Sequence, residues 1–148
     1  MKYYLRNITE SDKNFIYNVK KASIMDYVQK IWGWDEEYQI RDFESDFILE
    51  NFKIITVEGV DIGFVQTTEE PLNINIIEIH IIPEYQGYGI GSSIINHILE
   101  EASKKRKTVR IGCFIDNSRA KKLYQKLGFK VVNITNTHYE MEYGPENL

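Results

Sequence analysis

The chain has 148 residues, a formal net charge of −4 at pH 7 and a composition that is 43% hydrophobic. A chain of this length normally forms one domain, so we expect a single domain over residues 1–148 that folds without a metal or a disulfide. The charge gives no sign of a large basic surface, which disfavours nucleic-acid binding, and no apolar run approaches the length of a membrane span.

The cysteine content and the N-terminal residues bear on the compartment. Cys113 is the only cysteine and has no partner for an internal disulfide, which fits a reducing environment. The first residues contain no apolar segment typical of a signal peptide. We therefore expect a cytoplasmic protein, either a monomer or a homodimer, without a membrane partner.

The first third of the chain predicts a strand and two helices. Residues 2–8 alternate loosely, as a strand does, and Thr9–Asp12 supply side chains that cap a helix. Apolar residues at helical spacing then predict a helix that ends near Ile31. Gly33 interrupts it, and Asp35 can cap a second helix that has one apolar face and one acidic face.

The middle of the chain changes to a period of two. Residues 53–58 and 62–68 predict two strands of a hairpin joined across Gly59–Asp61. Pro71–Asn73 then turn the chain into a third strand of this group, over residues 74–82. We expect this strand to be central in the sheet.

The last part predicts a helix that follows the glycines at 87, 89 and 91 and has Lys104–Lys107 at its C-terminal end. A strand at 109–115, a helix capped by Asn117, and strands at 129–135 and 138–143 follow. The element order is therefore β-α-α-β-β-β-α-β-α-β-β. It predicts a layered α/β fold in which helices flank a central, mixed and mainly antiparallel sheet.

The segment from Glu78 to Ser92 is the most informative one. Its isoleucine-rich strand ends at Pro83, and three alternating glycines follow before an amphipathic helix begins. Glycines allow a close approach of the backbone to an anion, and a helix N-terminus offers free N–H groups and partial positive charge. The segment therefore predicts a phosphate-binding loop; the alternative is an ordinary glycine-rich connection between a strand and a helix.

The spacing of the glycines separates several phosphate-binding motifs. A dinucleotide fingerprint needs a third glycine where this chain has Ser92, and a P-loop needs a lysine that is missing here. What remains is Gln86-x-x-Gly89-x-Gly91 after a strand and a proline. This pattern resembles the acetyl-CoA pyrophosphate loop of the GNAT family of N-acyltransferases.

A second motif agrees with this resemblance. Residues 117–129 read Asn-Ser-Arg-Ala-Lys-Lys-Leu-Tyr-Gln-Lys-Leu-Gly-Phe. They resemble the GNAT signature Asn-x-x-Ala-x-x-Leu-Tyr-x-x-x-Gly-Phe, and one predicted strand separates the two motifs. Core packing explains the leucines and a helix stop explains Gly128, but neither explains the hydroxyl of Tyr124.

The resemblance implies binding of acetyl-CoA through two segments. Backbone groups of Ile81 and Ile82 are expected to pair with the pantetheine arm, and the N–H groups of 86–92 to hold the pyrophosphate. Many relatives have Arg where this chain has Gln86, which braces the loop but adds no charge. The residues implied in binding are Ile81, Ile82, Gln86, Gly87, Tyr88, Gly89, Ile90, Gly91, Ser92, Asn117, Ala120, Lys122 and Tyr124.

Acyl transfer to an amine needs a base for the ammonium, a donor for the oxyanion and a proton for the leaving thiolate. The resemblance places Tyr124 beside the thioester sulfur, where it can give that proton. Glu78 and His80, two residues apart on a strand, are expected on one face, where either can accept the amine proton or the two can pair structurally. Cys113 is expected to be inert core, and no metal is expected.

In this family the first two helices line the acceptor side. Four aromatic residues there, followed by many carboxylates, suit a cationic amine; the alternative is that they are core and the acids a solvated face. They are Tyr27, Trp32, Trp34 and Tyr38.

The expected activity is acetyl transfer from acetyl-CoA to a primary amine of a small molecule or peptide by direct attack in a ternary complex. Two alternatives stay open: a non-catalytic acetyl-CoA sensor or interaction module, and a protein N-terminal or lysine acetyltransferase.

Overall fold

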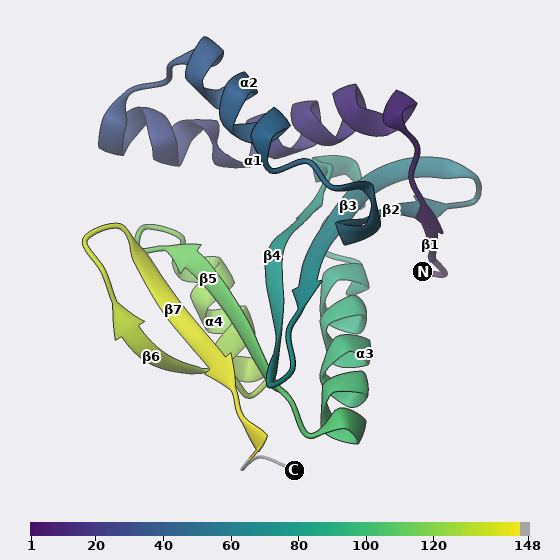
Figure 1. Ribbon diagram of the computed structural model, residues 1–148, viewed down its shortest axis with the longest axis vertical. Coiled ribbons are helices and arrows are strands. Elements are labelled where there is room, and N and C mark those ends of the chain that lie inside the picture. The colour runs from purple at the N-terminus through teal and green to yellow at the C-terminus, as the bar shows by residue number, and fades with distance from the viewer. Residues whose placement is uncertain (146–148) are drawn as a thin grey trace. The chain divides into compact units, whose positions relative to one another are not determined.

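The computed structural model describes residues 1–145 (Figure 1). The strands are β1 (Tyr4–Asn7), β2 (Phe52–Val57), β3 (Val60–Glu69), β4 (Asn73–Ile81), β5 (Thr108–Phe114), β6 (Lys130–Ile134) and β7 (His138–Tyr143). The helices are α1 (Lys13–Trp32), α2 (Glu36–Ser45), α3 (Ile90–Lys105) and α4 (Ser118–Lys126). Short 3-10 turns lie at Glu10–Asp12, Leu49–Asn51 and Pro83–Tyr85. The order of helices and strands is the predicted one.

The strands form one seven-stranded sheet in the order β1-β2-β3-β4-β5-β7-β6. β4 pairs with β5 in parallel, whereas the pairs β1–β2, β2–β3, β5–β7 and β6–β7 are antiparallel. The sheet is therefore mixed and mainly antiparallel, with β4 at its centre, and helices flank it. This confirms the predicted fold class.

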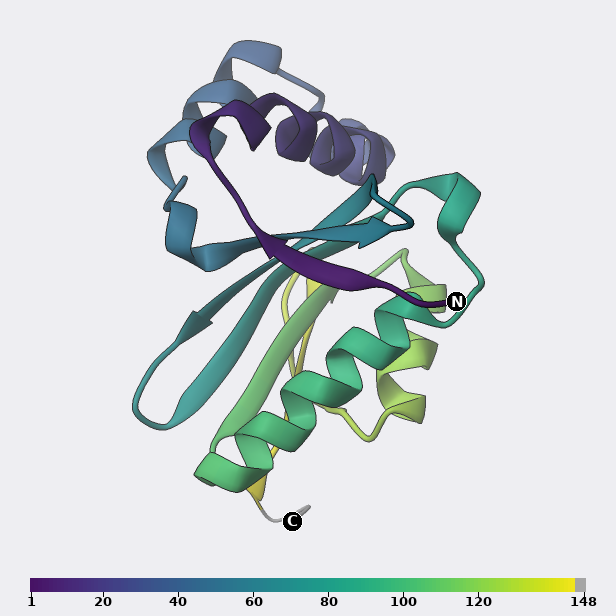
Figure 2. The ribbon, with the colours of Figure 1, turned by 90° about the vertical axis from the view of Figure 1, so that its right-hand side faces the viewer.

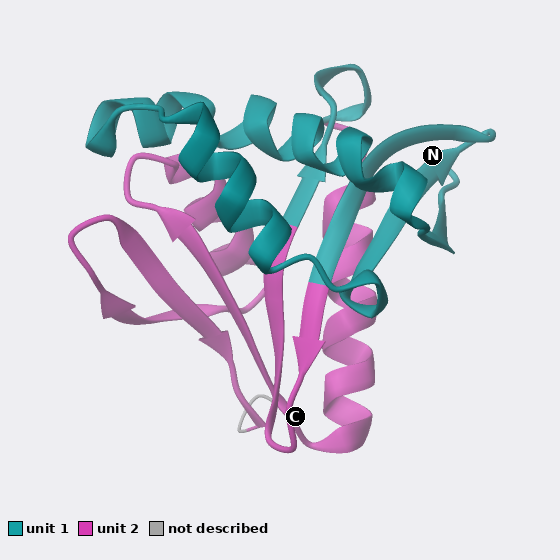
Figure 3. Cartoon of the chain, turned by 45° about the horizontal axis from the view of Figure 1, so that its top comes forward, with its two compact units in different colours: residues 1–66, 79–86 teal, residues 67–78, 87–148 magenta. Residues whose placement is uncertain are grey.

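The chain divides into two compact units, shown in different colours in Figure 3. Unit 1 comprises residues 1–66 and 79–86, and unit 2 comprises residues 67–78 and the chain from Gly87 onward. β3 and β4 each begin in one unit and end in the other. The single domain expected over 1–148 stays a prediction.

Unit 1 is built around an aromatic core beneath α1 and α2. Ring contacts run from Tyr17 through Phe43, Phe47 and Phe52 to Phe64, with ring centroids 4.9–6.0 Å apart. Such offset and edge contacts add to the free energy gained by burying the rings. The buried members of this core are Ile8, Ile16, Val19, Phe43, Phe52, Ile54 and Phe64.

Unit 2 has its core where α3 lies along β5 (Figure 2). The buried residues of α3 recur at helical spacing, so one face of the helix is apolar. They are Ile90, Ile94, Ile95, Leu99 and Ala102. On β5, Val109, Ile111 and Cys113 alternate with more exposed residues, as expected for a strand with one covered face.

Helix ends follow the local signals in the sequence. Gly33, with φ of +79°, ends α1, and the Asp35 carboxylate accepts a hydrogen bond from the Tyr38 N–H at 3.1 Å to cap α2. Asn117 Oδ1 accepts one from the Ala120 N–H at 3.1 Å to cap α4, and Gly128, with φ of +107°, follows the end of that helix. Among the described residues, no helix has the length and apolarity to cross a membrane.

Candidate active site

Two glycines leave space beside the backbone of the loop that precedes α3. Gly87 and Gly89 have φ of +85° and +79°, and a Cβ added at either would have no heavy atom within 4 Å. Gly89 is the N-cap of α3, and no side chain caps that end or places an acid in its first turn. The first N–H groups of a helix lack partners within the helix. This terminus is therefore suited to an anion such as pyrophosphate.

Gln86 braces the end of β4 from within unit 1. Its Nε2 donates to the Ile81 carbonyl oxygen at 2.8 Å. The Ile82 N–H donates to Ile62 O at 2.8 Å, and Ile82 O accepts from the Tyr85 N–H at 3.0 Å. Both backbone groups of Ile82 are therefore already engaged. Neighbouring residues of a strand point their backbone groups to opposite edges. Ile81 is therefore better placed than Ile82 to pair with an extended ligand such as a pantetheine arm.

Tyr124 is the one buried residue of α4, with 9% of its surface exposed. Burial raises the pKa of its phenol, and the nearby Cys113 and Glu78 raise it further. The hydroxyl therefore remains protonated at neutral pH.

Three other predicted binding residues lie on the same helix or at its N-cap. Asn117 uses its side-chain oxygen as the helix cap, so its amide N–H groups are what it can offer a ligand. Ala120 is half-buried and Lys122 is exposed.

Glu78 and His80 have different surroundings, although both lie on β4. The charge of Glu78 acts on Tyr124 and on His138, all three within unit 2. The imidazole of His80 lies against Phe64, a core residue of unit 1, with ring centroids 5.6 Å apart. The structure thus associates Glu78 with Tyr124.

His138 was not predicted as a site residue. It lies on β7 opposite Phe114 of β5, with the two ring centroids 4.3 Å apart, and its Nδ1 is 2.7 Å from the Thr137 hydroxyl. Burial lowers its pKa, while Glu78 and Glu140 act in the opposite direction. No motif marks this residue, and only the pairing of β7 with β5 reveals where it lies.

Cys113 is buried, and its burial raises the pKa of the thiol. A thiol in this state is a weak nucleophile, as the sequence predicted. Within residues 1–145, no cluster of three or more His, Cys, Asp or Glu side chains has the arrangement of a metal site.

Trp34 belongs to a network around Glu36 in unit 1. Glu36 accepts hydrogen bonds from Tyr17 Oη at 2.8 Å and Trp34 Nε1 at 2.7 Å, and pairs with Lys21 Nζ at 2.8 Å. Hydrogen bonds from Lys21, Trp34 and Tyr17 lower the pKa of the Glu36 carboxyl to about 2, and the bond from Lys21 is the largest cause.

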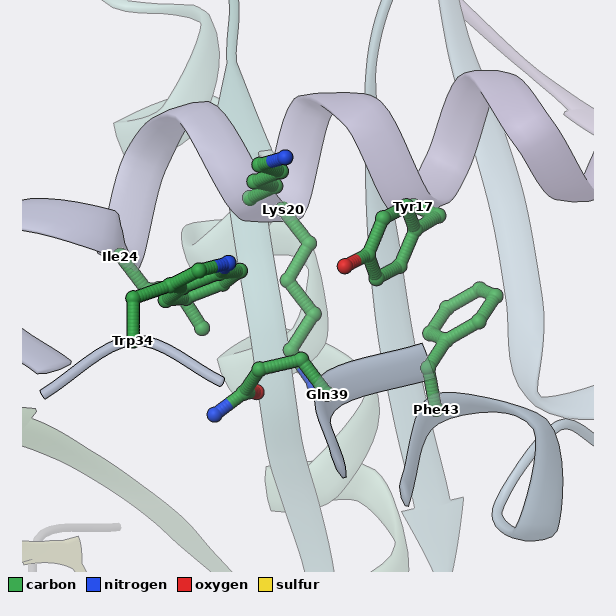
Figure 4. Close-up of a pocket in the computed structure, with 7 residues that line it drawn as sticks. Tyr17, Lys20, Ile24, Trp34, Gln39 and Phe43 are labelled. Carbon is green, nitrogen blue, oxygen red and sulfur yellow. The ribbon is translucent and has the colours of Figure 1, made fainter. Parts of the chain in front are cut away.

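Figure 4 shows Trp34, from the α1–α2 connection, facing residues of α1 and α2, among them Tyr17, Lys20 and Phe43. The other aromatic residues predicted on this side differ in exposure: Tyr27 is half-buried, whereas Trp32 and Tyr38 are 63% and 54% exposed. The contacts of Trp34 favour a role in holding α1 and α2 together.

Comparison with known proteins agrees with the two motifs. An acetyltransferase (GNAT) domain model matches residues 49–131, more than half of the chain. The chain therefore belongs to the GNAT acetyltransferase family.

Two curated relatives and one solved structure illustrate this similarity. The chain is 30% identical over 137 residues to an uncharacterized N-acetyltransferase of Methanocaldococcus jannaschii, covering 86% of this chain and 61% of that protein. It is 39% identical over 66 residues to the thialysine N-epsilon-acetyltransferase of Bos taurus, covering 44% of this chain and 39% of that protein. The chain thus spans less than two thirds of either relative.

The PaiA N-acetyltransferase of Thermoplasma acidophilum, solved in complex with coenzyme A, has a similar fold. Its TM-score is 0.76 at 20% identity, with 97% of this chain and 99% of that one covered.

Proposed function

We propose that this protein transfers an acetyl group from acetyl-CoA to a primary amine of a small-molecule or peptide acceptor. Membership of the GNAT family supports the reaction class. The observation that carries the proposal is Tyr124: a buried tyrosine whose phenol stays protonated under the influence of burial and of Glu78, on the helix that the second motif marks. A module that only sensed acetyl-CoA would not need Tyr124 as a proton donor.

The residues around α3 fit the phosphate end of acetyl-CoA. The N-terminus of α3 has no side-chain cap and no acid, and the glycines before it leave the backbone open. N–H groups of residues 87–92 would hold the pyrophosphate, and Gln86 would keep the end of β4 in place. Because Gln86 brings no charge, Lys122 would add the positive charge.

The residues near Tyr124 account for the proton transfers of the reaction. Glu78 would accept the first proton of the acceptor ammonium, and the neutral amine would then attack the acetyl carbonyl. Tyr124 would donate a proton to the departing sulfur and regain one from the newly acylated nitrogen. The reaction releases one proton in total, with the acetyl group on nitrogen and coenzyme A as the thiol.

Backbone groups would stabilise the charge that develops on the acetyl oxygen. The Ile81 N–H is the natural donor, because the Ile82 N–H is bonded to Ile62 O at 2.8 Å. A fixed main-chain donor costs no reorganisation when the charge develops. His80, beside Phe64, is the alternative base if Glu78 does not act.

For the acceptor we propose a cationic amine recognised by aromatic residues of the first two helices. Tyr27, Trp32 and Tyr38 are the candidate contacts, because Trp34 is committed to Glu36. The bovine relative is named a thialysine N-epsilon-acetyltransferase, which supports an amine acceptor.

Release of free coenzyme A, measured with acetyl-CoA and a panel of diamines, lysine analogues and peptides, tests the proposal. We expect release with at least one amine, and abolition of that release by Gly89→Asp. Release with peptides alone would favour the protein acetyltransferase. Binding of acetyl-CoA without release under any condition would favour the sensor and contradict the proposal.

A further inference from the structure

Lys121 lies one turn before Tyr124 on α4, within unit 2. Residues three apart on a helix are neighbours on its surface, with Cβ atoms about 5–6 Å apart. Tyr124 is buried and Lys121 is half-buried, whereas Lys122 and Lys126 are exposed. Lys121 is therefore the lysine of α4 that shares the covered side of the helix with Tyr124.

The ammonium of Lys121 has a defined place over β7. Its Nζ lies 4.1 Å from the centroid of the Tyr139 ring, which is the geometry of a cation–π contact. Tyr139 is opposite Cys113 in the ladder between β7 and β5, so the two side chains stand on one face of the sheet. The charge of Lys121 reaches the Cys113 thiol, in agreement with this placement.

The same row of the sheet contains the proposed base. The parallel register of β4 and β5, extended two residues past Ile76, places Glu78 beside Cys113. Glu78 and Cys113 both act electrostatically on Tyr124 of α4. Lys121 thus adds a positive charge to the row in which the base and the acid of the proposed reaction meet.

We propose that Lys121 is the fixed cation of the acyl-transfer site, where its ammonium stabilises the thiolate of coenzyme A as that group departs beside Tyr124. This inference rests on the proposed acetyl transfer. The amine nitrogen forms its bond to the acetyl carbon, the carbon–sulfur bond breaks, and the electron pair of that bond passes to sulfur. Tyr124 supplies the proton of the thiol, while Lys121 keeps its own proton. Lys121 acts at a distance through its charge and does not touch the substrate.

A purely structural role does not need a charge at position 121. A leucine or methionine would pack on the Tyr139 ring without removing an ammonium from water, which costs free energy. The contact with the ring offsets part of this cost and fixes the ammonium before the reaction begins. A charge that is already in place needs no reorganisation when negative charge develops. The charge of Lys121 is therefore the feature that packing leaves unexplained.

The titration of Cys113 tests the placement of the charge without requiring turnover. Cys113 is the only cysteine, so isotope labelling of cysteine gives a single Cβ signal in nuclear magnetic resonance spectra. We expect Lys121→Met to raise the pKa of Cys113, because a cation that favours the thiolate is removed. The other titratable groups around Cys113 stay in place in this variant: Glu78 of β4, Tyr139 of β7 and Tyr124 of α4.

Lys126→Met is the matched control, because it removes the charge of an exposed lysine on the same helix. It should leave the titration of Cys113 unchanged. A wild-type titration of Cys113 in Lys121→Met would place the ammonium too far from this row and overturn the proposal.

Steady-state kinetics test the role in the reaction. We expect Lys121→Met to lower kcat by about tenfold, less than the roughly 10²–10³-fold effect of a donor that contacts the developing charge directly. The KM for acetyl-CoA should stay close to that of the wild type. Lys121→Arg keeps both the charge and the contact with the ring, so it should retain most of the rate. Lys126→Met should keep the wild-type rate.

A double variant separates stabilisation of the thiolate from a structural role. In Tyr124→Phe the sulfur departs without a proton from the phenol, so its full negative charge depends more on Lys121. Lys121→Met should therefore lower kcat by a larger factor in the Tyr124→Phe background than in the wild type. Equal factors in the two backgrounds would mean that the residues act independently and would overturn the proposal.

Two results would overturn the proposals separately. A wild-type kcat in Lys121→Met would overturn the role of Lys121 alone. Failure of the wild-type protein to release coenzyme A with any amine would overturn the proposed function, and the role of Lys121 in turnover with it. If Lys121→Met unfolds, Lys121→Gln, which also removes the charge, is measured in its place with the same expected changes in kcat and in the titration of Cys113.

Discussion

Gln86 donates a hydrogen bond from its side-chain Nε2 to the backbone carbonyl of Ile81, 2.8 Å away. This hydrogen bond links Gln86, the first residue of the Gln-x-x-Gly-x-Gly motif, to the end of β4 that is proposed to bind pantetheine. We expect Gln86→Ala to weaken acetyl-CoA binding by about fivefold, since one neutral hydrogen bond contributes about 1 kcal/mol. Gln86→Arg retains a donor and adds charge, so it should bind more tightly, in a salt-dependent manner. Tighter binding by Gln86→Ala in calorimetry would instead mean that Gln86 competes with the ligand for Ile81.

The sequence predicts these local features well and the non-local ones poorly. Asp35, Asn117 and Gly128 mark helix ends within a few residues of themselves, so the order of helices and strands could be predicted. The place of His138 depends on the register between β5 and β7, which no short pattern encodes. The donors to Glu36 come from α1 and from the connection between the helices, and periodicity does not determine how two helices meet.

Gly89 provides a test of the phosphate loop. Gly89→Asp places a carboxylate at the N-terminus of α3, where the pyrophosphate is proposed to bind, and strains a residue with φ of +79°. We expect acetyl-CoA affinity in calorimetry to fall by about 30-fold or more, roughly 2 kcal/mol. Gly59→Asp is the matched control, because Gly59 also has φ of +79° and open space around an added Cβ. Equal losses in the two variants would mean that strain, rather than charge at the loop, weakens binding.

Tyr124 is expected to act on the rate rather than on binding. Tyr124→Phe should lower kcat about 10²-fold with acetyl-CoA affinity nearly unchanged. The raised pKa keeps the phenol protonated as pH rises, so in the wild type Tyr124 should not cause a loss of rate below about pH 10. Tyr4→Phe, an exposed residue of β1, is the control. A wild-type kcat in Tyr124→Phe would show that Tyr124 is not the acid that protonates the departing sulfur.

Gly63 fixes how closely β3 approaches β4. A Cβ added there would lie 2.2 Å from the His80 carbonyl oxygen and 3.0 Å from Ile81 Cα, both backbone atoms that cannot move aside alone. We expect Gly63→Ala to destabilise the protein by about 1–3 kcal/mol or more, measured by urea unfolding. Gly112→Ala meets the Tyr139 carbonyl oxygen at 3.3 Å and should cost less. Similar stability of the two variants would show that β4 shifts freely, which would weaken the case for Ile81 as a fixed oxyanion donor.

Glu36 should make the stability of unit 1 sensitive to acid. The pKa of its carboxyl falls from an ordinary 4.5 to about 2 in the folded protein, mainly through Lys21 and then through Trp34 and Tyr17. A lowered folded-state pKa means that the network stabilises the protein fully above pH 4.5, and that this stabilisation disappears as pH falls toward 2. Glu36→Gln should therefore melt below the wild type at pH 7, and the gap in melting temperature should close with acidification. Glu37→Gln, at a side chain that is 90% exposed, is the control, and its melting temperature should stay close to that of the wild type at every pH. A gap for Glu36→Gln that is constant from pH 7 to pH 2 would show that lost packing, rather than the charge on Glu36, causes the destabilisation.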